Sequence, residues 1–234
     1  MKKAAVLCRG KSLKHINMLP DIDEYVIVNR FGEELEDERI SHKIGDSPIT
    51  HILSPADGEL DLMLRYGSFN KFNINEIVFP YAKETVPPHA WNIKVEGKNG
   101  ILPMSNLSEK IKPYMWTPET QPDIVKEDRV YEFNLPTSGI AGICHASIEL
   151  DYDEIHIIGM DFYDVGYAYG SEFSSIEAGR TVALHETEPM KHFLSENLCK
   201  RLPNKNFHMY TYSDYNPNLE NLHITKFVEE LDND

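Results

Sequence analysis

The sequence predicts an α/β fold with a mostly parallel sheet flanked by helices. β-branched runs alternate along the chain with segments whose apolar residues recur at helical spacing, and such alternation requires crossover connections between parallel strands. The first run ends in a glycine-containing loop that leads into a helix start. Apolar residues make up 41% of the 234 positions, enough for one packed core. We therefore expect residues 1–234 to form a single domain.

Short β-branched or alternating segments are the predicted strands. The first is an apolar run closed by a polar loop, and the sixth has the strongest strand pattern in the chain. The predicted strands are Ala4–Cys8, Tyr25–Asn29, Ile49–Leu53, Glu76–Tyr81, Arg129–Asn134, Glu154–Phe162 and Asn206–Ser213.

Two amphipathic segments between these runs are predicted to be helices. Gly139–Leu150 combines apolar and small residues, so it can lie close against a sheet. Thr187–Leu202 has apolar residues at helical spacing and Pro189 in its first turn. Residues 84–128 are rich in Pro, Asn, Gly and Lys and predict long loops with little regular structure. Residues 164–184, with three glycines among aromatic residues, predict an active-site loop or lid.

The charge of the chain narrows the classes of partner. Its formal net charge is −15, which argues against nucleic acid because the phosphates would be repelled. Basic residues nevertheless gather near the N-terminus: Lys2, Lys3, Arg9, Lys11 and Lys14. This local group suits a small anion such as a nucleotide, although solvated end charges are the alternative.

Cysteine spacing and hydropathy point to the cytoplasm. Cys8, Cys144 and Cys199 are far apart, without zinc or disulfide spacing, and are expected to be buried thiols in a reducing compartment. Too few apolar residues follow Met1-Lys2-Lys3 for a signal peptide, and no apolar stretch approaches bilayer length.

Ligands of open parallel sheets bind at the carboxyl ends of the strands, so residues following each strand are site candidates. Arg9, Gly10 and Ser12 follow the first strand, where Gly10 permits a tight turn and the helix start offers free N–H groups to a phosphate. This loop has only one glycine of the GxGxxG pattern. Asn29 follows the second strand, and its side-chain amide suits a ribose or base edge; a turn-forming Asn is the alternative.

Polar residues also flank the Gly139–Leu150 helix and the strongest strand. Thr137-Ser138-Gly139 offers hydroxyls and helix N-terminal amides to an anion or sugar, with a plain N-cap as the alternative. Asp161 and Tyr163 follow the strongest strand, and Tyr169 lies in the predicted lid. The two phenols could donate hydrogen bonds to a leaving phosphate, or could simply pack as aromatic rings.

His185 lies two residues before Thr187, the expected N-cap of the last long helix. The positive end of that helix would keep the imidazole neutral, as a general base requires; a surface histidine is the alternative. The nearby Glu186, Glu188 and His192 do not complete an HExxH pattern, and the chain has no DxD triplet. We therefore predict neither a metal nor a cofactor.

Together these positions resemble glycosyltransferase family 42, the bacterial α-2,3/2,8-sialyltransferases. Thr137-Ser138-Gly139 matches the family's TSG turn, and Gly159-Met160-Asp161-Phe162-Tyr163, followed by Gly166 and Tyr169, resembles its GxDFYxxGxxY motif. Asn29-Arg30-Phe31 resembles an NxF segment, and His185 corresponds to the catalytic histidine. The stretch from Met1-Lys2-Lys3 to Ser12-Leu13-Lys14 resembles the nucleotide loop GNGPSLK less specifically. The resemblance fades over residues 40–125.

The resemblance implies a GT-A-like variant of the Rossmann fold and a single inverting displacement without metal. His185 would deprotonate the acceptor hydroxyl, while Tyr163 and Tyr169 would stabilise the departing phosphate. The donor would be a CMP-activated acidic sugar, sialic acid or the related Kdo. The resemblance makes Gly10, Ser12, Asn29, Thr137 and Ser138 its ligands. To these we add Arg9, whose guanidinium can pair with a carboxylate or phosphate, together with Gly139 and Asp161. The acceptor would be a glycan of lipooligosaccharide or capsule, and the enzyme a homotetramer peripherally associated with membrane.

The chain departs from the family pattern at several positions, and two other functions stay open. Arg9 and Lys11 replace the Asn and Pro of the first loop, Leu135-Pro136 replaces an Arg before the TSG turn, and Val182 replaces a Tyr. A similar first loop occurs in archaeal pterin pyrophosphokinase-like enzymes, which use ATP and magnesium. A non-catalytic nucleotide- or glycan-binding protein is the third interpretation.

Overall fold

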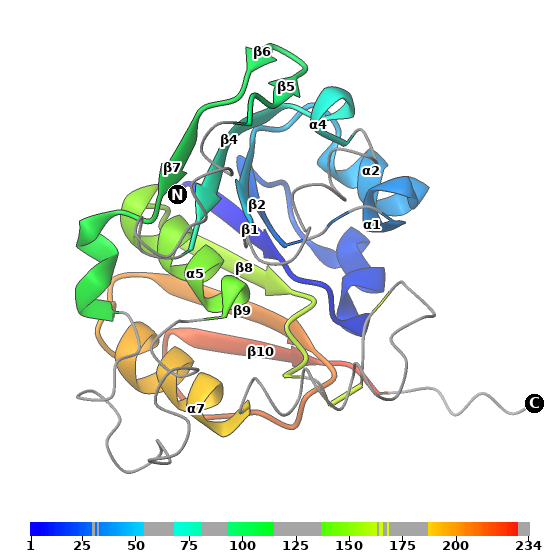
Figure 1. Ribbon diagram of the computed structural model, residues 1–234. Helices are drawn as coiled ribbons and strands as arrows, with labels where there is room; N and C mark the ends of the chain where they lie inside the picture. The colour runs from blue at the N-terminus through cyan, green and yellow to red at the C-terminus, as the bar shows by residue number, and fades with distance from the viewer. Residues whose placement is uncertain are drawn as a thin grey trace, which may run out of the picture.

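The computed structural model describes residues 1–29, 31, 33–53, 68–80, 93–114, 137–162, 164–165, 168 and 187–228. Within these residues, eight strands form one sheet in the order β10-β9-β8-β1-β2-β3-β4-β7, and every neighbouring pair is parallel. Figure 1 shows helices on both faces of this sheet. The predicted fold class, a mostly parallel sheet flanked by helices, is therefore confirmed.

Most strand boundaries agree with the predicted runs to within two residues, but β8 ends at Ile158 rather than at the predicted Phe162, because the chain turns at Gly159, whose φ is positive. The strands of the sheet are β1 (Lys3–Leu7), β2 (Glu24–Val28), β3 (Ile49–Ile52), β4 (Ile74–Phe79), β7 (Met104–Asn106), β8 (Glu154–Ile158), β9 (Asn206–Thr211) and β10 (Leu222–Lys226). The helices are η1 (Lys11–Met18), α1 (Glu33–Glu36), α2 (Glu38–Ile44), α4 (Ser68–Lys71), η4 (Glu109–Tyr114), α5 (Ser138–Cys144), η6 (His145–Glu149), α7 (Thr187–His192) and η7 (Phe193–Cys199).

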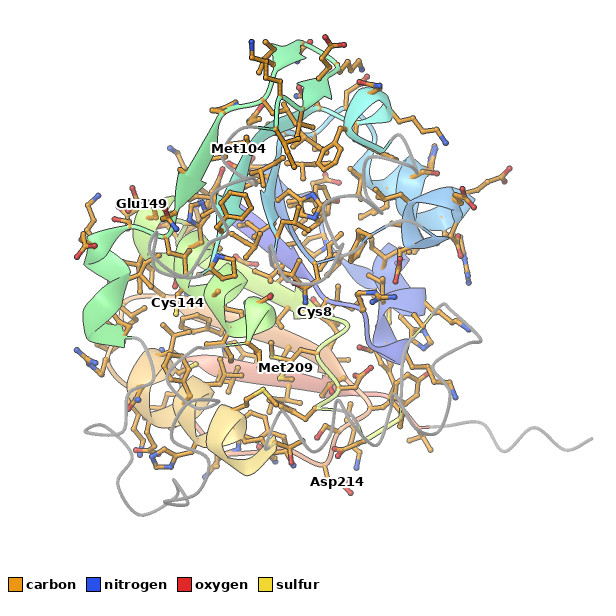
Figure 2. The ribbon with its side chains drawn as sticks, in the orientation of Figure 1. Cys8, Met104, Cys144, Glu149, Met209 and Asp214 are labelled. Atoms are coloured by element: carbon orange, nitrogen blue, oxygen red, sulfur yellow. The ribbon has the colours of Figure 1, made fainter. Side chains whose placement is uncertain are left out.

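The sheet separates two apolar clusters because successive residues of a strand point to opposite faces. In β8, Ile155 and Ile157 pack with α5, η6, α7 and η7, whereas Ile158 packs with η1, α2 and α4. Figure 2 shows Cys144 and Met209 between the sheet and the helices of the first cluster. Burial on both faces explains why the central strands are continuous apolar runs.

Helix α5 lies unusually close to the sheet because Gly142 has no side chain. A Cβ atom at Gly142 would lie 2.9 Å from Cγ1 of Val28 and 3.1 Å from Cγ1 of Val6. The small residues of this segment therefore permit the close packing that the sequence predicts, and the same approach brings the start of α5 to the carboxyl end of β1.

The order of the strands reverses between β1 and β8. From β1 the chain proceeds outward through β2, β3, β4 and β7, and it then returns to place β8 on the other side of β1. The crevice between the loops that follow two such strands is where ligands of open α/β sheets bind. The loops after β1 and β8 are therefore the first place to look for a site.

Some predicted elements differ from those observed. The strand β10 was missed because only Leu222 is buried in this edge strand, so the segment LHITK has little apolar signature. Residues 84–128 were predicted to have little regular structure; their described part holds short elements only, namely β7, η4 and a small hairpin of β5 (Glu96–Gly97) and β6 (Gly100–Ile101). The predicted strand Arg129–Asn134 and most of the predicted lid 164–184 lie outside the described residues.

Cys8, Cys144 and Cys199 are buried and unpaired, as predicted. Burial raises the pKa of the Cys8 and Cys144 thiols to about 12, so both remain protonated at neutral pH. None of the helices in the described part of the chain has the length and hydropathy needed to cross a membrane.

Two buried imidazoles make the stability of this fold depend on pH. Burial lowers the pKa of His145 and of His51 to about 4. Neither ring nitrogen of His145 has a hydrogen-bond partner among the described residues, and the Glu76 carboxylate lies 3.8 Å from its Nε2. Both histidines must therefore be neutral in the folded state, whereas unfolding lets them bind protons near their ordinary pKa.

The contribution of these two neutral histidines to the free energy of unfolding should be complete above about pH 6.5 and should fall as the pH drops toward 4. Acidification from pH 6.5 to 5 should cost about 2 kcal/mol for each buried histidine, because only the unfolded chain takes up the proton. Urea unfolding at several pH values will measure this loss. His145→Leu should remove about one histidine's share of it, whereas His42→Ala, on the surface of α2, should not. An unchanged pH slope in His145→Leu would contradict the assignment.

Candidate functional site

The Asp161 carboxylate connects three strand ends at the switch point. Its Oδ2 accepts a hydrogen bond from the Ser12 amide (2.8 Å) at the start of η1. Its Oδ1 accepts from the Thr211 hydroxyl (2.9 Å) and from the Tyr212 amide (3.0 Å) at the end of β9. The side chain is 2% exposed, so these donors replace water around a buried carboxylate.

The loops after β1 and β8 approach each other so closely that two positions require glycine. A Cβ at Gly10 would lie 2.5 Å from both Oδ2 of Asp161 and the carbonyl oxygen of Gly159. Gly159 has a φ of +79°, and a Cβ there would lie 2.1 Å from the Cys8 carbonyl oxygen. The Gly10 amide donates to the Gly159 carbonyl (2.6 Å), and the Gly159 amide donates to the Ser12 hydroxyl (2.9 Å).

These bonds correct one expectation about the first loop. The sequence predicted free N–H groups at the start of η1 for a phosphate, but the amides of Gly10 and Ser12 are both used within the protein. The Asp161 carboxylate itself occupies the anion position of this helix start. That Gly10, Ser12 and Asp161 contact a donor directly remains a prediction; the structure shows that they hold the two loops together.

Asn29, at the end of β2, has a buried side-chain oxygen without a hydrogen-bond partner among the described residues. Its backbone is left-handed, with a φ of 58°, a conformation that asparagine tolerates better than most residues. The Nε2 of buried His51 lies 2.7 Å from the Asn29 carbonyl oxygen. Because a carbonyl only accepts, that nitrogen carries the proton, and His51 fixes the turn that presents the Asn29 amide.

Thr137-Ser138-Gly139 forms the N-terminus of α5 next to the first loop. Thr137 is the N-cap, and its hydroxyl accepts from the Ile140 amide at 3.4 Å. A Cβ at Gly139 would lie 3.2 Å from Cys8 Sγ and 2.6 Å from the Met160 side chain, so this turn touches the residues after both β1 and β8. The first amides of a helix have no partner inside it and point outward toward a ligand.

Arg9 is engaged by a buried carboxylate of α1. Its Nε donates to Glu34 at 2.8 Å, and the two side chains are 13% and 1% exposed. Another cation, Lys191 of α7, lies 5.6 Å from the centre of the Phe162 ring. The predicted contact between Arg9 and the donor remains a prediction, since at least one of its donors already serves Glu34.

Backbone strain occurs directly after Asp161. Phe162 has a φ of 49°, a conformation unusual for an aromatic residue, and its ring packs edge-on against Tyr215 with centroids 5.1 Å apart. Strain of this kind persists where the surrounding structure enforces it, and it clusters at functional sites.

A pocket of about 340 Å³ lies beside these strand ends. Its walls come from the first residues of the predicted lid and from the ends of β9 and β10: Asp164, Val165, Tyr212, Asp214, Lys226, Phe227 and Val228. Another cavity, of about 660 Å³ between η1 and α2, is lined by none of the predicted site residues.

The described residues bring together part of the predicted site. The loops bearing Arg9, Gly10, Ser12 and Asp161 meet at the switch point, and the TSG turn touches Cys8 and Met160 there. Tyr163, Tyr169 and His185 lie outside the described residues, so their predicted roles are not tested.

The residues that support this site were not among the predicted ones. His51 interrupts the apolar run of β3, and Glu34 precedes the buried Leu35 in α1; a polar residue within an apolar pattern was the available signal. Thr211 was assigned to the last strand without a role, although residues at strand ends are site candidates in a parallel sheet.

Comparison with solved structures identifies the fold. A variant of sialyltransferase CST-II in complex with CMP superposes with a TM-score of 0.56 over 97% of this chain and 90% of that one, at 17% identity. CST-II with a trisaccharide acceptor and CMP superposes with a TM-score of 0.53 over 89% of this chain and 80% of that one, at 17% identity. CstII from Campylobacter jejuni with the substrate analogue CMP-3FNeuAc has a TM-score of 0.53 over 96% of this chain and 86% of that one, at 16% identity. The chain shares its fold with these sialyltransferases. No family model and no curated protein matches the sequence.

The Arg9–Glu34 pair should contribute to folding whatever the ligand is. Arg9→Ala should cost roughly 3 kcal/mol of unfolding free energy, because it leaves the Glu34 carboxylate buried without its cation. Arg9→Ala combined with Glu34→Gln should recover most of that loss in urea unfolding. Arg39→Ala, which breaks the exposed pair with Asp37, is the matched control and should cost less than about 1 kcal/mol. A double variant as unstable as Arg9→Ala would refute this role.

Proposed function

We propose that this chain is an inverting, metal-independent glycosyltransferase that moves an acidic sugar from a CMP-sugar to a glycan hydroxyl. The observation that carries the proposal is the strand-end site at the switch point, where the TSG turn and the GMDFY segment meet. This site occurs in a fold shared with sialyltransferase structures that hold CMP, a substrate analogue or a trisaccharide acceptor.

The arrangement of helix starts favours a donor with a single phosphate. Asp161 occupies the start of η1, whereas the start of α5, with the hydroxyls of Thr137 and Ser138 at its first positions, receives no such carboxylate from the residues that the structure describes. A helix N-terminus stabilises one compact anion well. CMP-sugars carry one phosphate, whereas ATP brings three and normally requires magnesium.

Asn29 supports recognition of the nucleoside. Its side-chain oxygen accepts no hydrogen bond from a described residue, and a ribose hydroxyl or an exocyclic base amine would supply a donor. The amide group next to it can donate in return, so Asn29 can read a ligand edge that offers both a donor and an acceptor.

The catalytic assignment follows the sequence. His185 takes the proton of the acceptor hydroxyl, the acceptor oxygen attacks the anomeric carbon, and the bond from that carbon to the CMP phosphate breaks with inversion. Tyr163 and Tyr169 donate hydrogen bonds to the charge that develops on the leaving phosphate. No metal is required by this scheme, because the phenols and the α5 amides supply the stabilisation.

Cytoplasmic location, homotetramer formation and peripheral membrane association are also proposed. Light scattering tests the homotetramer, and vesicle flotation tests the membrane association.

Nucleotide binding tests the donor class. Calorimetry should rank CMP above UDP, GDP and ATP, with no effect of magnesium, because the site offers one phosphate position. Turnover of a CMP-sugar should survive EDTA in protein that stays folded by circular dichroism. Tighter ATP binding with magnesium, together with lost activity under chelation, would instead favour the pyrophosphokinase function. Nucleotide binding without turnover of any donor would favour a non-catalytic binding protein.

Substitution of the proposed base separates chemistry from binding. His185→Ala should lower the rate by roughly 10²–10⁴-fold while CMP affinity stays within about twofold, since a general base acts only in the transition state. Tyr163→Phe and Tyr169→Phe should each cost up to roughly 10²–10³-fold. His192→Ala, on the exposed side of α7, is the control and should keep full activity. Near-normal turnover in His185→Ala would mean that His185 is an ordinary surface histidine.

A further inference from the structure

Three imidazoles form a row across one end of the sheet, away from the strand-end site. His156 of β8 lies opposite His208 of β9, which lies opposite His223 of β10. The rings of His156 and His208 stack with centroids 4.7 Å apart and planes 14° apart. Because residues two apart in a strand share a face, Glu154 and Tyr210 stand on this same face, opposite the one that packs against α5 and α7.

We propose that Glu154, His156 and His208 form a binding site for a divalent transition metal of the zinc type. The Oε1 atom of Glu154 lies 2.8 Å from Nε2 of His156 and 3.7 Å from Nε2 of His208, and the three ligand atoms all lie within 4.8 Å of one another. Ligands bound tetrahedrally at about 2.1 Å are roughly 3.4 Å apart, so modest side-chain rotation suffices.

The ligand set and its accessibility favour zinc over magnesium or calcium. Two imidazoles and one carboxylate are borderline ligands that suit Zn²⁺, whereas the hard cations prefer oxygen alone. His156 is buried, but the His208 side chain is 29% exposed, so an ion can enter from that side. The three ligands leave a fourth tetrahedral position for water or an exchangeable group.

Tyr210 supplies the outer contact that metal-binding histidines usually have. Its hydroxyl lies 3.2 Å from Nδ1 of His156. Without metal, Nε2–H of His156 can donate to Glu154 while Nδ1 accepts from Tyr210. With metal on Nε2, the same neutral ring carries its proton on Nδ1 and donates to the Tyr210 oxygen. Loading therefore exchanges one tautomer for the other, and His156 neither gains nor loses a proton.

Lys3 competes with the metal for the carboxylate. Its Nζ lies 3.5 Å from Oε1 of Glu154, with the Lys3 side chain 33% exposed. A bound cation must displace this ammonium into solvent, which its length permits. Removal of the Lys3 ammonium should therefore strengthen metal binding at the proposed site.

The site would stabilise the fold rather than act on the donor. Asp161 stands five positions after His156, a separation on the order of 15 Å at the rise of a strand. A metal there cannot reach a phosphate at the strand ends, but it would link β8 to β9. Its presence is compatible with turnover that resists EDTA, so the two proposals can fail separately.

Titration of Zn²⁺ and Co²⁺ into untagged, metal-stripped full-length protein tests the site. We expect one ion per chain, a rise in thermal midpoint with Zn²⁺, and a Co²⁺ absorption spectrum of low coordination number. His208→Ala and Glu154→Gln should weaken the affinity at least about 100-fold and abolish the thermal shift, while Lys3→Ala should strengthen it. His42→Ala, a histidine of α2 outside the cluster, should bind like the parent protein.

Equal affinity of the parent and His208→Ala would overturn the proposal, as would equal losses in His208→Ala and His42→Ala. Because His208 is the least buried of the three ligands, this variant should remain folded, which circular dichroism checks. If Glu154→Gln unfolds, the comparison of His208→Ala with Lys3→Ala decides alone, since a purely structural row of histidines would give neither loss nor gain of metal binding.

Discussion

A single buried carboxylate fixes the frame on which the candidate site is built. Asp161 accepts from the Ser12 amide, the Thr211 hydroxyl and the Tyr212 amide, and so joins the chain after β1, β8 and β9. Hydrogen bonds to a charged group contribute more than neutral ones, and removing a donor would leave the charge poorly compensated. These hydrogen bonds therefore fix the loops relative to one another. Gly10 permits their close approach because it has no side chain.

This arrangement has a consequence for ligand charge in an acidic protein. An internal carboxylate already satisfies the start of η1, and Glu34 already pairs with Arg9, so two groups that would attract an external anion are partly neutralised from within. At the start of α5, by contrast, no acidic residue in the described part of the chain takes the position that Asp161 takes at η1. The proposed preference for a small ligand with a single phosphate is consistent with one such helix start and does not require a broad basic surface.

The sequence predicted the fold well because its central strands are buried on both faces and therefore read as apolar runs. It predicted strand-end residues for the same reason, since the ends of such runs are visible. It could not predict which residues bond to one another. Ser12 and Asp161 are 149 residues apart, and no local pattern indicates that Arg9 pairs with Glu34 or His51 with Asn29. Edge strand β10 was missed because exposure dilutes its apolar pattern.

Strand β8 carries different chemistry at its two ends because of its place in the sheet. As a neighbour of the switch point it delivers Asp161 to the crevice, while its amino half places Glu154 and His156 on the face opposite α5 and α7. Asp161 already ties the carboxyl end of β8 to that of β9. An ion between His156 and His208 would tie the same two strands near their amino ends. Both attachments would then restrain the strand pair whose loops frame the proposed donor site.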